Sequence, residues 1–182
     1  ILSAQCTDAR VNMVTPALFH KYPDAEAMAD ALQEDVEDII RSCGFFHTKS
    51  RNLIAMACEL SERFGGKVPD TIEQLTTLPG VGRKTANLII GDIYGKPAVV
   101  VDTHVIRITN LLGLVGTRDP VKIEHRLREL LPPDESASFC HRVVWHGRAV
   151  CVAGRPKCDA CCVSKYCAHA LSGAGGEKSQ KG

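Results

Sequence analysis

The chain has 182 residues, of which 45% are hydrophobic and 24% are charged, and its formal net charge is +1. These values are those of a soluble globular protein, and the length predicts one large domain or two small ones that fold without disulfide bonds. No run of eighteen apolar residues occurs, which argues against a membrane-spanning helix, and no secretory signal is visible. Because the chain opens on the apolar stretch ILSAQ without a methionine, we expect a helix that begins upstream of residue 1.

The charge is unevenly distributed along the chain. Residues 1–135 carry 15 basic and 19 acidic side chains, whereas residues 136–182 carry 7 basic and 2 acidic ones. The stretch 24–38 holds seven acids and no base. If the partner is a polyanion, we expect the C-terminal part to face it and the acidic stretch to face away. Two ordinary solvated faces explain the same pattern, and taken alone the pattern favours that explanation.

Apolar residues recur at helical spacing through most of the first hundred residues. The spacing predicts three helices, over residues 11–18, 35–43 and 49–64. Glycines follow the second and third and can end them. Pro16 lies inside the first and should distort or end it. Asp70 and Glu73 have the spacing of a capping box at the start of a short helix, TIEQLTTL.

The second half of the chain continues the helical pattern. Helices are predicted over residues 83–94, after a cap at Asp102, around 123–130 before Pro132, and over 139–150. The single strand-like run, AVVV at 98–101, is short and isolated, so it predicts a buried extended connection. The polar, glycine-rich tail is expected to be disordered. The pattern alone predicts an all-α fold.

Four cysteines near the C-terminus have the spacing C-x6-C-x2-C-x5-C: Cys151, Cys158, Cys161 and Cys167. The nine cysteines are odd in number and locally clustered, which argues against a secreted disulfide framework. Four sulfur ligands suit zinc or an iron–sulfur cluster. The asymmetric spacing favours a [4Fe–4S] cluster, since zinc sites more often show two separated CxxC pairs. We interpret Cys162 as a bystander and Cys6, Cys43, Cys58 and Cys140 as small core residues.

Between the first two of these cysteines lies the loop VAGRPK. A metal that pins both ends of the loop would present Arg155 and Lys157 rigidly to a phosphate. Basic residues in a surface loop are more commonly only solvated. Both interpretations stay open.

The stretch LPGVGRKTA, residues 78–86, has the pattern of a turn between two helices. Its glycines let backbone N–H groups approach a ligand closely, and the N-terminus of the following helix adds a positive dipole end. A DNA phosphate fits such a site and carries no sequence information. Short Pro/Gly turns between helices are common, so Arg83 and Lys84 are what strengthen the prediction.

Lys84 and Asp102 each allow two interpretations. Lys84 is either a second phosphate contact or a nucleophile, because positive potential at a helix N-terminus beside Arg83 favours the uncharged amine, which can form a Schiff base. Asp102 is either only a helix cap or also a partly buried carboxylate that accepts a proton and stabilises a cationic transition state.

These motifs together resemble one protein family. The segments LSAQCTD (2–8), LPGVGRKTA (78–86), VDTH (101–104) and HGR (146–148), with the cysteine spacing, are similar to endonuclease III, the iron–sulfur branch of the helix–hairpin–helix DNA glycosylases. The similarity runs in one register from residue 1 to about 169. It implies a two-lobed all-α fold: a six-helix lobe over 1–96 that lacks its N-terminal part, a cluster lobe over 97–170 and a disordered tail over 171–182.

The resemblance also implies roles for individual residues. Lys84 matches the family's nucleophile, Asp102 its catalytic aspartate, and the four cysteines its [4Fe–4S] ligands. The residues implied to contact DNA are Gln5, Phe45, Leu78, Pro79, Gly80, Val81, Gly82, Arg83, His104, Arg155 and Lys157. Within this set, Gln5 and His104 approach the extruded nucleotide, and Phe45 is a wedge that is often Leu in the family. Ser3 and Asp8 match lesion-pocket positions.

Without the resemblance to the family, several of these residues have ordinary structural interpretations. Gln5 would be a surface amide and Phe45 a core aromatic, while Ser3 and Asp8 would be helix caps or polar faces.

The implied activity is that of a bifunctional DNA glycosylase and AP lyase in base excision repair. It would excise oxidised pyrimidines through a lysine Schiff base and cleave 3′ to the site by β-elimination. The partner is double-stranded DNA with oxidised pyrimidines or abasic sites, and we expect a monomer in the bacterial cytoplasm, associated with the nucleoid. One alternative is an adenine glycosylase of the same superfamily, which usually lacks a lysine at position 84. The other is a non-catalytic iron–sulfur DNA-binding module, which would not need Lys84 and Asp102 together.

Overall fold

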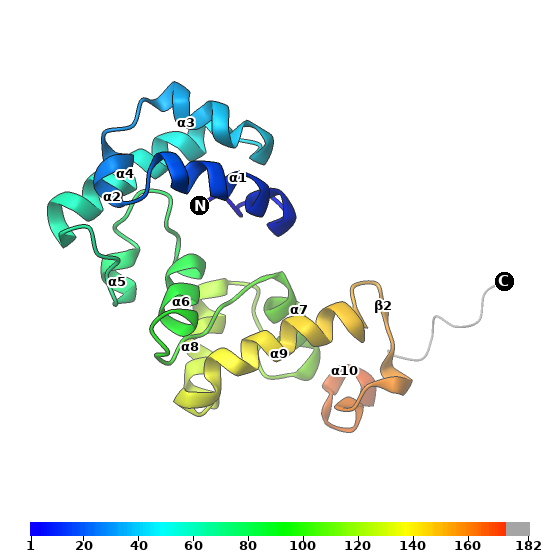
Figure 1. The fold of residues 1–182 in the computed structure, drawn as a ribbon. Helices are drawn as coiled ribbons and strands as arrows, with labels where there is room; N and C mark the ends of the chain where they lie inside the picture. Colours follow the sequence, from blue (N-terminus) through cyan, green and yellow to red (C-terminus); the bar gives the residue numbers. More distant parts are fainter. Residues whose placement is uncertain (174–182) are drawn as a thin grey trace. The chain divides into compact units, whose positions relative to one another are not determined.

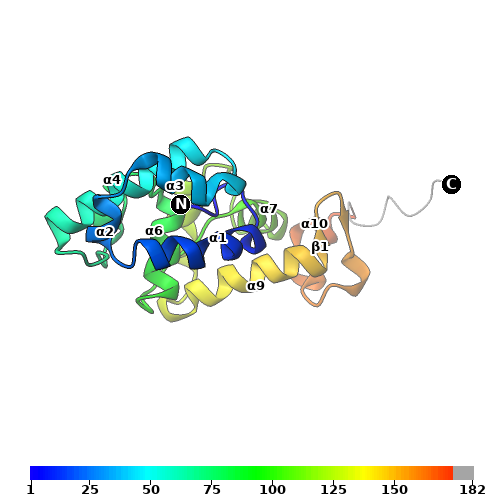
Figure 2. The same ribbon diagram turned by 45° about the horizontal axis from the view of Figure 1, so that its top comes forward.

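The computed structural model describes residues 1–173 and is built almost entirely of helices (Figures 1 and 2). The all-α class is therefore confirmed, with one short two-stranded sheet that the sequence pattern did not predict. Contacts divide the chain into two compact units, residues 1–86 and residues from 87 onward, and the division falls within one helix. The domain division expected between residues 96 and 97 stays a prediction, and residues 174–182 of the expected tail lie outside the described residues.

The first unit consists of helices and connecting turns. Its elements are α1 (Asp8–Lys21), α2 (Ala25–Ala29), α3 (Gln33–Ile40), the 3₁₀ helix η1 (Arg41–Cys43), α4 (Phe46–Phe64), α5 (Ile72–Leu75) and the start of α6 (Arg83–Asp92). Residues 1–7 form turns instead of the helix expected at the start of the chain. α4 packs against α2 and α3.

Local interactions fix the helix ends in this unit. The Thr7 side chain accepts a hydrogen bond from the Arg10 N–H and caps α1, which continues through Pro16 to Lys21. Pro16 therefore does not end the helix, which was one of the two outcomes expected for it. α5 is capped by Thr71, whose hydroxyl accepts from the Gln74 N–H at 3.3 Å, and not by Asp70 as predicted. Thr71 is one residue nearer to the helix. Its hydroxyl accepts from a first-turn N–H group that has no partner within the helix, as the Asp70 side chain was expected to do.

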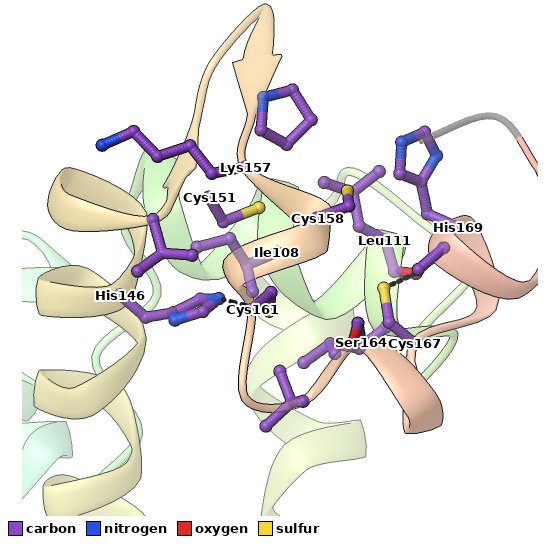
Figure 3. Close-up of a pocket in the computed structure, with 15 residues that line it drawn as sticks. Ile108, Leu111, His146, Cys151, Lys157, Cys158, Cys161, Ser164, Cys167 and His169 are labelled. Carbon is purple, nitrogen blue, oxygen red and sulfur yellow. Dashed lines mark hydrogen bonds between the residues drawn. The ribbon is translucent and has the colours of Figure 1, made fainter. Parts of the chain in front are cut away.

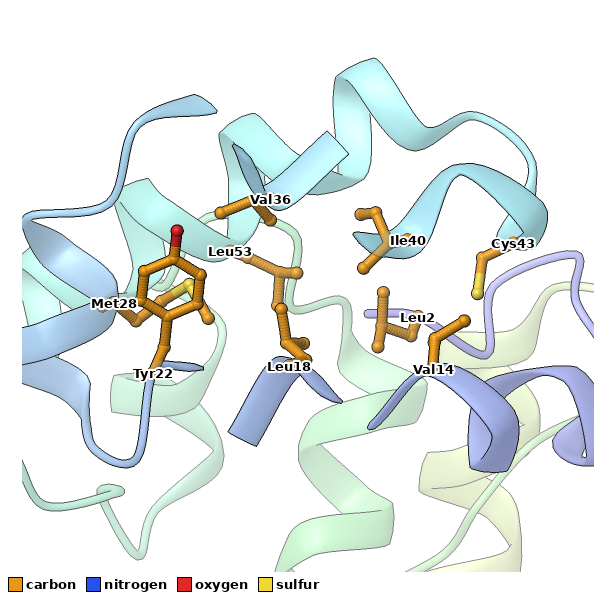
Figure 4. Close-up of a cluster of buried hydrophobic side chains, with 10 residues drawn as sticks. Leu2, Val14, Leu18, Tyr22, Met28, Val36, Ile40, Cys43 and Leu53 are labelled. Atoms are coloured by element: carbon orange, nitrogen blue, oxygen red, sulfur yellow. The ribbon is translucent and has the colours of Figure 1, made fainter. Parts of the chain in front are cut away.

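The core of the first unit is a contiguous set of buried apolar side chains (Figure 4). Leu18 from α1 and Val36 and Ile40 from α3 are at most 1% exposed. Leu53 from α4 packs among them, so the spacing that predicted these helices also gives their buried faces. Leu2 and Cys43 belong to the same core, which brings the start of the chain close to the end of η1.

The second unit continues α6 and adds further helices and a hairpin. Its elements are α7 (Thr103–Leu112), α8 (Pro120–Leu130), the 3₁₀ helix η2 (Pro133–Glu135), α9 (Ser136–Ala149), the strands β1 (Cys151–Val152) and β2 (Arg155–Pro156), the 3₁₀ helices η3 (Cys158–Ala160) and η4 (Ser164–Tyr166), and α10 (Ala168–Leu171). β1 and β2 are antiparallel, with Cys151 opposite Pro156. α9 runs alongside α7, and the hairpin and α10 lie at its C-terminal end (Figures 1 and 2).

Residues 98–101 form the predicted buried extended connection. Ala98 and Val99 are 0% exposed, and their N–H groups donate to side chains rather than to a strand. The Ala98 N–H donates to Ser136 Oγ at 3.1 Å, and the Val99 N–H donates to Asn87 Oδ1 at 3.2 Å. Because buried backbone donors need partners, these two bonds hold the segment that leads into α7.

Apolar residues of α7, α8 and α9 form the core of this unit together with the extended segment. Val105, Ile123 and Leu127 are 0% exposed. Cys140 lies among them, and burial raises the pKa of its thiol to about 11. No helix of the described residues is long and apolar enough to cross a membrane.

Candidate functional site

The predicted helix–turn–helix is present in the first unit. The turn begins after α5, where the Leu78 N–H donates to the Leu75 carbonyl and the Val81 N–H donates to the Leu78 carbonyl. Gly80 has a φ of +74°, and a β carbon there would lie 3.0 Å from Asn52 Cβ. Only glycine fits that conformation and that approach without strain. α6 then starts at Arg83, and the Ala86 N–H donates to the Gly82 carbonyl at 3.0 Å.

Lys84 is exposed in the first turn of α6. Among the described residues of the first unit, no hydrogen bond or ion pair holds its ammonium group. The N-terminal turn of a helix carries unpaired N–H groups and a positive dipole end. Lys84 therefore lies where an incoming anion or electrophile would meet it.

Three predicted DNA-contact residues line one cavity of the first unit. Gln5, Phe45 and Gly80 border a cavity of about 560 Å³, part of which is open to solvent. Gln5 has a φ of 52° and Phe45 a φ of 47°, and these are the two non-glycine residues of the described chain in the left-handed region. Phe45 is 67% exposed, so its interpretation as a core aromatic is wrong. Such strained residues are concentrated at functional sites.

The two predicted lesion-pocket residues stand outside this cavity. Ser3 and Asp8 are both exposed, Ser3 in the opening turns and Asp8 in the first turn of α1. Neither lines the cavity beside Gln5 and Phe45. Their role stays a prediction.

Sequence reasoning missed five residues that line the same cavity: Ile1, Ala4, Thr48, Lys49 and Asn52. Lys49 is buried in the first turn of α4. A cation at that end of a helix is opposed by the dipole. This unfavourable placement at the start of a helix was the sequence feature that could have indicated a specific role for Lys49.

Asp102 caps α7 in the second unit, as predicted. Its Oδ1 accepts a hydrogen bond from the Val105 N–H at 2.8 Å, and the residue is half-buried. One cap bond leaves the carboxylate able to accept further hydrogen bonds. Lys84 belongs to the first unit and Asp102 to the second, so their cooperation stays a prediction.

His104 lies in the first turn of α7 and packs against α9. A β carbon at Gly147 would lie 2.5 Å from His104 Nδ1 and 2.9 Å from Ile108 Cδ1. Gly147, in the HGR stretch, therefore permits the close approach of α9 to α7. His104 Nδ1 is buried and has no hydrogen-bond partner among residues 1–173. Its predicted contact with DNA stays a prediction.

The four cysteines of the predicted metal centre line one cavity (Figure 3). The cavity has a volume of about 380 Å³, including space open to solvent, and Ile108 and Leu111 of α7 contribute its apolar wall. Cys151 comes from β1, Cys158 from η3, and Cys161 and Cys167 flank η4. The structure thus brings together all four residues that the spacing singled out.

Three of these sulfurs make hydrogen bonds to neighbouring groups. Arg107 Nη1 donates to Cys151 Sγ at 3.5 Å, and the Cys167 thiol donates to the Leu111 carbonyl at 3.3 Å. His146 Nε2 lies 3.5 Å from Cys161 Sγ (Figure 3). Such outer contacts orient metal ligands and tune their electron density.

The thiols also act on each other electrostatically. Burial, followed by the nearby sulfurs of Cys151, Cys167 and Cys161, raises the pKa of the Cys158 thiol. Four thiolates gathered in this cavity therefore repel one another until a cationic group neutralises them. In the described residues, no three His, Cys, Asp or Glu side chains are arranged around a point that could hold a single metal ion.

The loop between the first two cysteines is a hairpin. Arg155 and Lys157 are both exposed, and Lys157 Nζ donates to the Ala149 carbonyl at 3.2 Å. The hairpin thereby holds two cations at the surface beside the cysteine cavity.

The remaining cysteines differ in how deeply they are buried. Cys43 and Cys140 are each 2% exposed and are core residues, as predicted. Cys6 and Cys58 are half-buried, and Cys162 is exposed next to Cys161.

Comparison with known proteins places this geometry in a family. Residues 1–133 match the HhH-GPD superfamily of base excision DNA repair proteins. Endonuclease III of Synechocystis sp. is 47% identical over 168 residues, covering 92% of this chain and 77% of the relative. Endonuclease III of Thermotoga maritima is 38% identical over 167 residues, covering 92% of this chain and 78% of the relative.

Solved structures agree. A trapped endonuclease III–DNA covalent intermediate, an estranged-adenine complex, superposes with a TM-score of 0.85 at 38% identity, covering 95% of this chain and 82% of that one. A thermostable thymine-DNA glycosylase shares the fold with a TM-score of 0.83 at 23% identity, covering 94% of this chain and 81% of that one.

The fold and the matched residues define a base excision DNA repair protein of the HhH-GPD superfamily. Its helix–turn–helix and its cysteine cavity are the features that the sequence motifs predicted. Within that superfamily the chain belongs to the endonuclease III family, and it is accordingly a DNA glycosylase.

Replacing Gly147 by alanine tests the close approach of α9 to α7. Gly147→Ala should lower the free energy of unfolding by about 1–3 kcal/mol, since the added methyl overlaps His104 and Ile108. Gly116→Ala is the matched control, because nothing lies within 4 Å of a β carbon there. Urea denaturation followed by circular dichroism measures both. Equal stability of the two variants would contradict the packing.

Proposed function

We propose that this chain is a bifunctional DNA glycosylase and AP lyase, which removes oxidised pyrimidines from duplex DNA and cleaves the strand 3′ to the site. The observation that carries the proposal is the exposed Lys84 at the N-terminus of α6, directly after the glycine turn. The relative trapped as a covalent intermediate with DNA supports a nucleophilic step. A primary amine suits that step, because its lone pair can attack an electrophilic carbon and form a Schiff base.

Lys84 is the nucleophile in this mechanism. Its uncharged Nζ attacks C1′ of the sugar, and the N-glycosidic bond breaks as the base leaves with the bonding electron pair and a proton. Opening of the sugar ring moves a second proton from the amine to the ring oxygen and leaves a Schiff base between Nζ and C1′. The Schiff base acidifies the C2′ proton, and its removal expels the 3′ phosphate by β-elimination. Water then releases Lys84.

Asp102 is the carboxylate that assists this attack. It stabilises the positive charge that develops on the sugar and relays the first proton of the attacking amine to the departing base. The half-buried position of Asp102 supports the role, since charge interactions are stronger away from water. The buried segment 98–101 before it supports a fixed orientation of the carboxylate.

C1′ is not accessible inside a stacked duplex, so the damaged nucleotide must be flipped out. We assign Phe45 and Gln5 to the gap that it leaves, His104 to the extruded nucleotide, and Ser3 and Asp8 to the pocket for the flipped base. The shared cavity of Gln5 and Phe45 supports the first assignment. So does the relative's covalent complex, which is described as an estranged-adenine complex.

Backbone and basic groups provide contacts to DNA phosphates. The turn from Leu78 to Gly82 and Arg83 offers N–H groups and positive potential at the start of α6. The hairpin cations Arg155 and Lys157 offer a second contact, supported by their exposure. Phosphate contacts of this kind position the enzyme without reading sequence.

Cys151, Cys158, Cys161 and Cys167 hold a [4Fe–4S] cluster in this proposal. The shared cavity of the four cysteines supports a common metal centre, and their asymmetric spacing supports a cluster over zinc. When bound, the cluster gives structural support to loop 152–157.

The lyase assignment is tested by trapping. Wild-type protein incubated with an abasic-site duplex and borohydride should form a covalent adduct, and Lys84→Ala should lose at least about a thousandfold of it. Lys67→Ala, which removes an exposed lysine of the same unit, should form as much adduct as wild type. If Lys84→Ala forms as much adduct as wild type, the lyase assignment is wrong. Adenine release without strand cleavage would identify an adenine glycosylase, and DNA binding without either reaction a binding module.

The carboxylate role of Asp102 is tested by Asp102→Asn. Asparagine caps a helix as well as aspartate does, so α7 and the melting temperature should be preserved. The single-turnover rate of base release should fall by about 10²–10⁴-fold, because the carboxylate's charge and basicity are lost. A variant that keeps more than half of the wild-type rate would show that Asp102 is only a cap.

The cofactor is tested by elemental analysis of the purified protein. We expect about four iron and four sulfide per chain, with broad absorption near 400 nm, and loss of both on Cys158→Ser. Cys162→Ser should keep the full iron content, because Cys162 lies outside the cavity. One zinc per chain in place of iron would contradict the cluster.

A further inference from the structure

Lys49 is the buried cation of the described chain. It is 5% exposed, while every other lysine and arginine in residues 1–173 is more accessible. Its Nζ donates to the carbonyl oxygens of Leu2 and Cys43, at 2.9 Å each. No carboxylate in the part of the chain that the structure describes pairs with it. Two backbone carbonyls are therefore what satisfies this charge inside the protein.

The position of Lys49 makes its burial more unfavourable. It lies in the first turn of α4, where the helix dipole opposes a cation. A neutral apolar side chain of the same length would avoid both the dipole and the burial of charge. What an apolar side chain cannot do is donate hydrogen bonds to two separate segments at once.

The two segments that Lys49 joins carry the strained residues of this unit. Leu2 lies in the opening turns, which continue to Gln5, and Cys43 ends η1, which continues to Phe45. Both Gln5 and Phe45 adopt left-handed backbone conformations. A residue stays in such a conformation only when the surrounding structure holds it there.

Lys49 also lines the cavity that Gln5 and Phe45 share. The ammonium has three N–H donors, of which the two carbonyls use two. The bridge thus joins the two segments beside the cavity that both exposed side chains line.

We propose that Lys49 is a positioning residue for flipping. It sets the distance between the opening turns and the end of η1, so that Gln5 and Phe45 enter the same gap in the duplex. This inference rests on the proposed function, because it assigns Lys49 to the step before attack by Lys84. An error of about 1 Å in such a placement can lower a rate by about a hundredfold.

The test separates flipping from chemistry. An abasic site in a single-stranded oligonucleotide has no opposite strand and no gap to fill, so it reports on the chemical step without flipping. Lys49→Met keeps the length of the side chain and removes its donors. Under single-turnover conditions with cyanoborohydride at saturating protein, we expect duplex trapping to fall about ten- to a hundredfold and single-strand trapping to change less than about twofold.

A fluorescent base gives a readout without chemistry. 2-Aminopurine placed opposite the abasic site should brighten when wild-type protein fills the gap and displaces it, and should stay quenched with Lys49→Met. Lys49→Gln, which keeps an N–H donor, should recover part of both signals. Ser50→Ala is the matched control: Ser50 is also buried in α4, but it bonds to the His47 carbonyl and to Glu37, and neither loop is involved.

The outcomes distinguish this inference from the proposed function. No trapping by wild-type protein on either substrate would remove the proposed function itself. Trapping by wild-type protein, with an equal fall on both substrates for Lys49→Met, would overturn the positioning role and leave Lys84 as the nucleophile. Failure of both Lys49 variants to give a wild-type circular dichroism spectrum would also overturn it, since Lys49 would then only stabilise the fold.

Discussion

The hydrogen bonds that hold the buried segment 98–101 govern the arrangement of the second unit. Ala98 and Val99 have no strand partner, so their N–H groups depend on Ser136 and Asn87. Asn87 Oδ1 also accepts from Arg128 at 2.9 Å, which ties the segment to α8. The segment ends at Asp102, where α7 begins, and α7 in turn supplies apolar residues to the cysteine cavity. One buried connection therefore determines where both the carboxylate and the wall of the cysteine cavity stand.

Much of this arrangement follows from local sequence. The apolar spacing gave the buried faces of α3, α4 and α8, and Asp102 was recognisable as a cap because a short acceptor preceded an apolar-periodic stretch. The glycine turn at 78–82 and the four cysteines were also local patterns. Local sequence did not decide whether α1 ends at Pro16: the helix continues because its packing through Val14 and Leu18 outweighs one lost backbone bond.

Other features depend on contacts between distant residues and could not be predicted. Nothing near Gln5 or Phe45 in the sequence indicates a left-handed backbone, since glycine or asparagine would be the expected residue there. The bridge from Lys49 spans 47 residues to Leu2. The need for Gly147 appears only once α9 lies against His104 of α7. In each case the residue type is explained by a neighbour that only the fold supplies.

The ring of Phe45 has a thermodynamic consequence. In the unbound protein this aromatic side chain is 67% exposed, and its backbone is in the strained left-handed region. Exposure to water is unfavourable for an apolar ring. In the proposed role, insertion between stacked bases would dehydrate the ring, so the exposed ring of the free enzyme would supply part of the driving force for DNA association. That contribution would carry a negative heat-capacity change, distinct from the salt-dependent contribution of the proposed phosphate contacts.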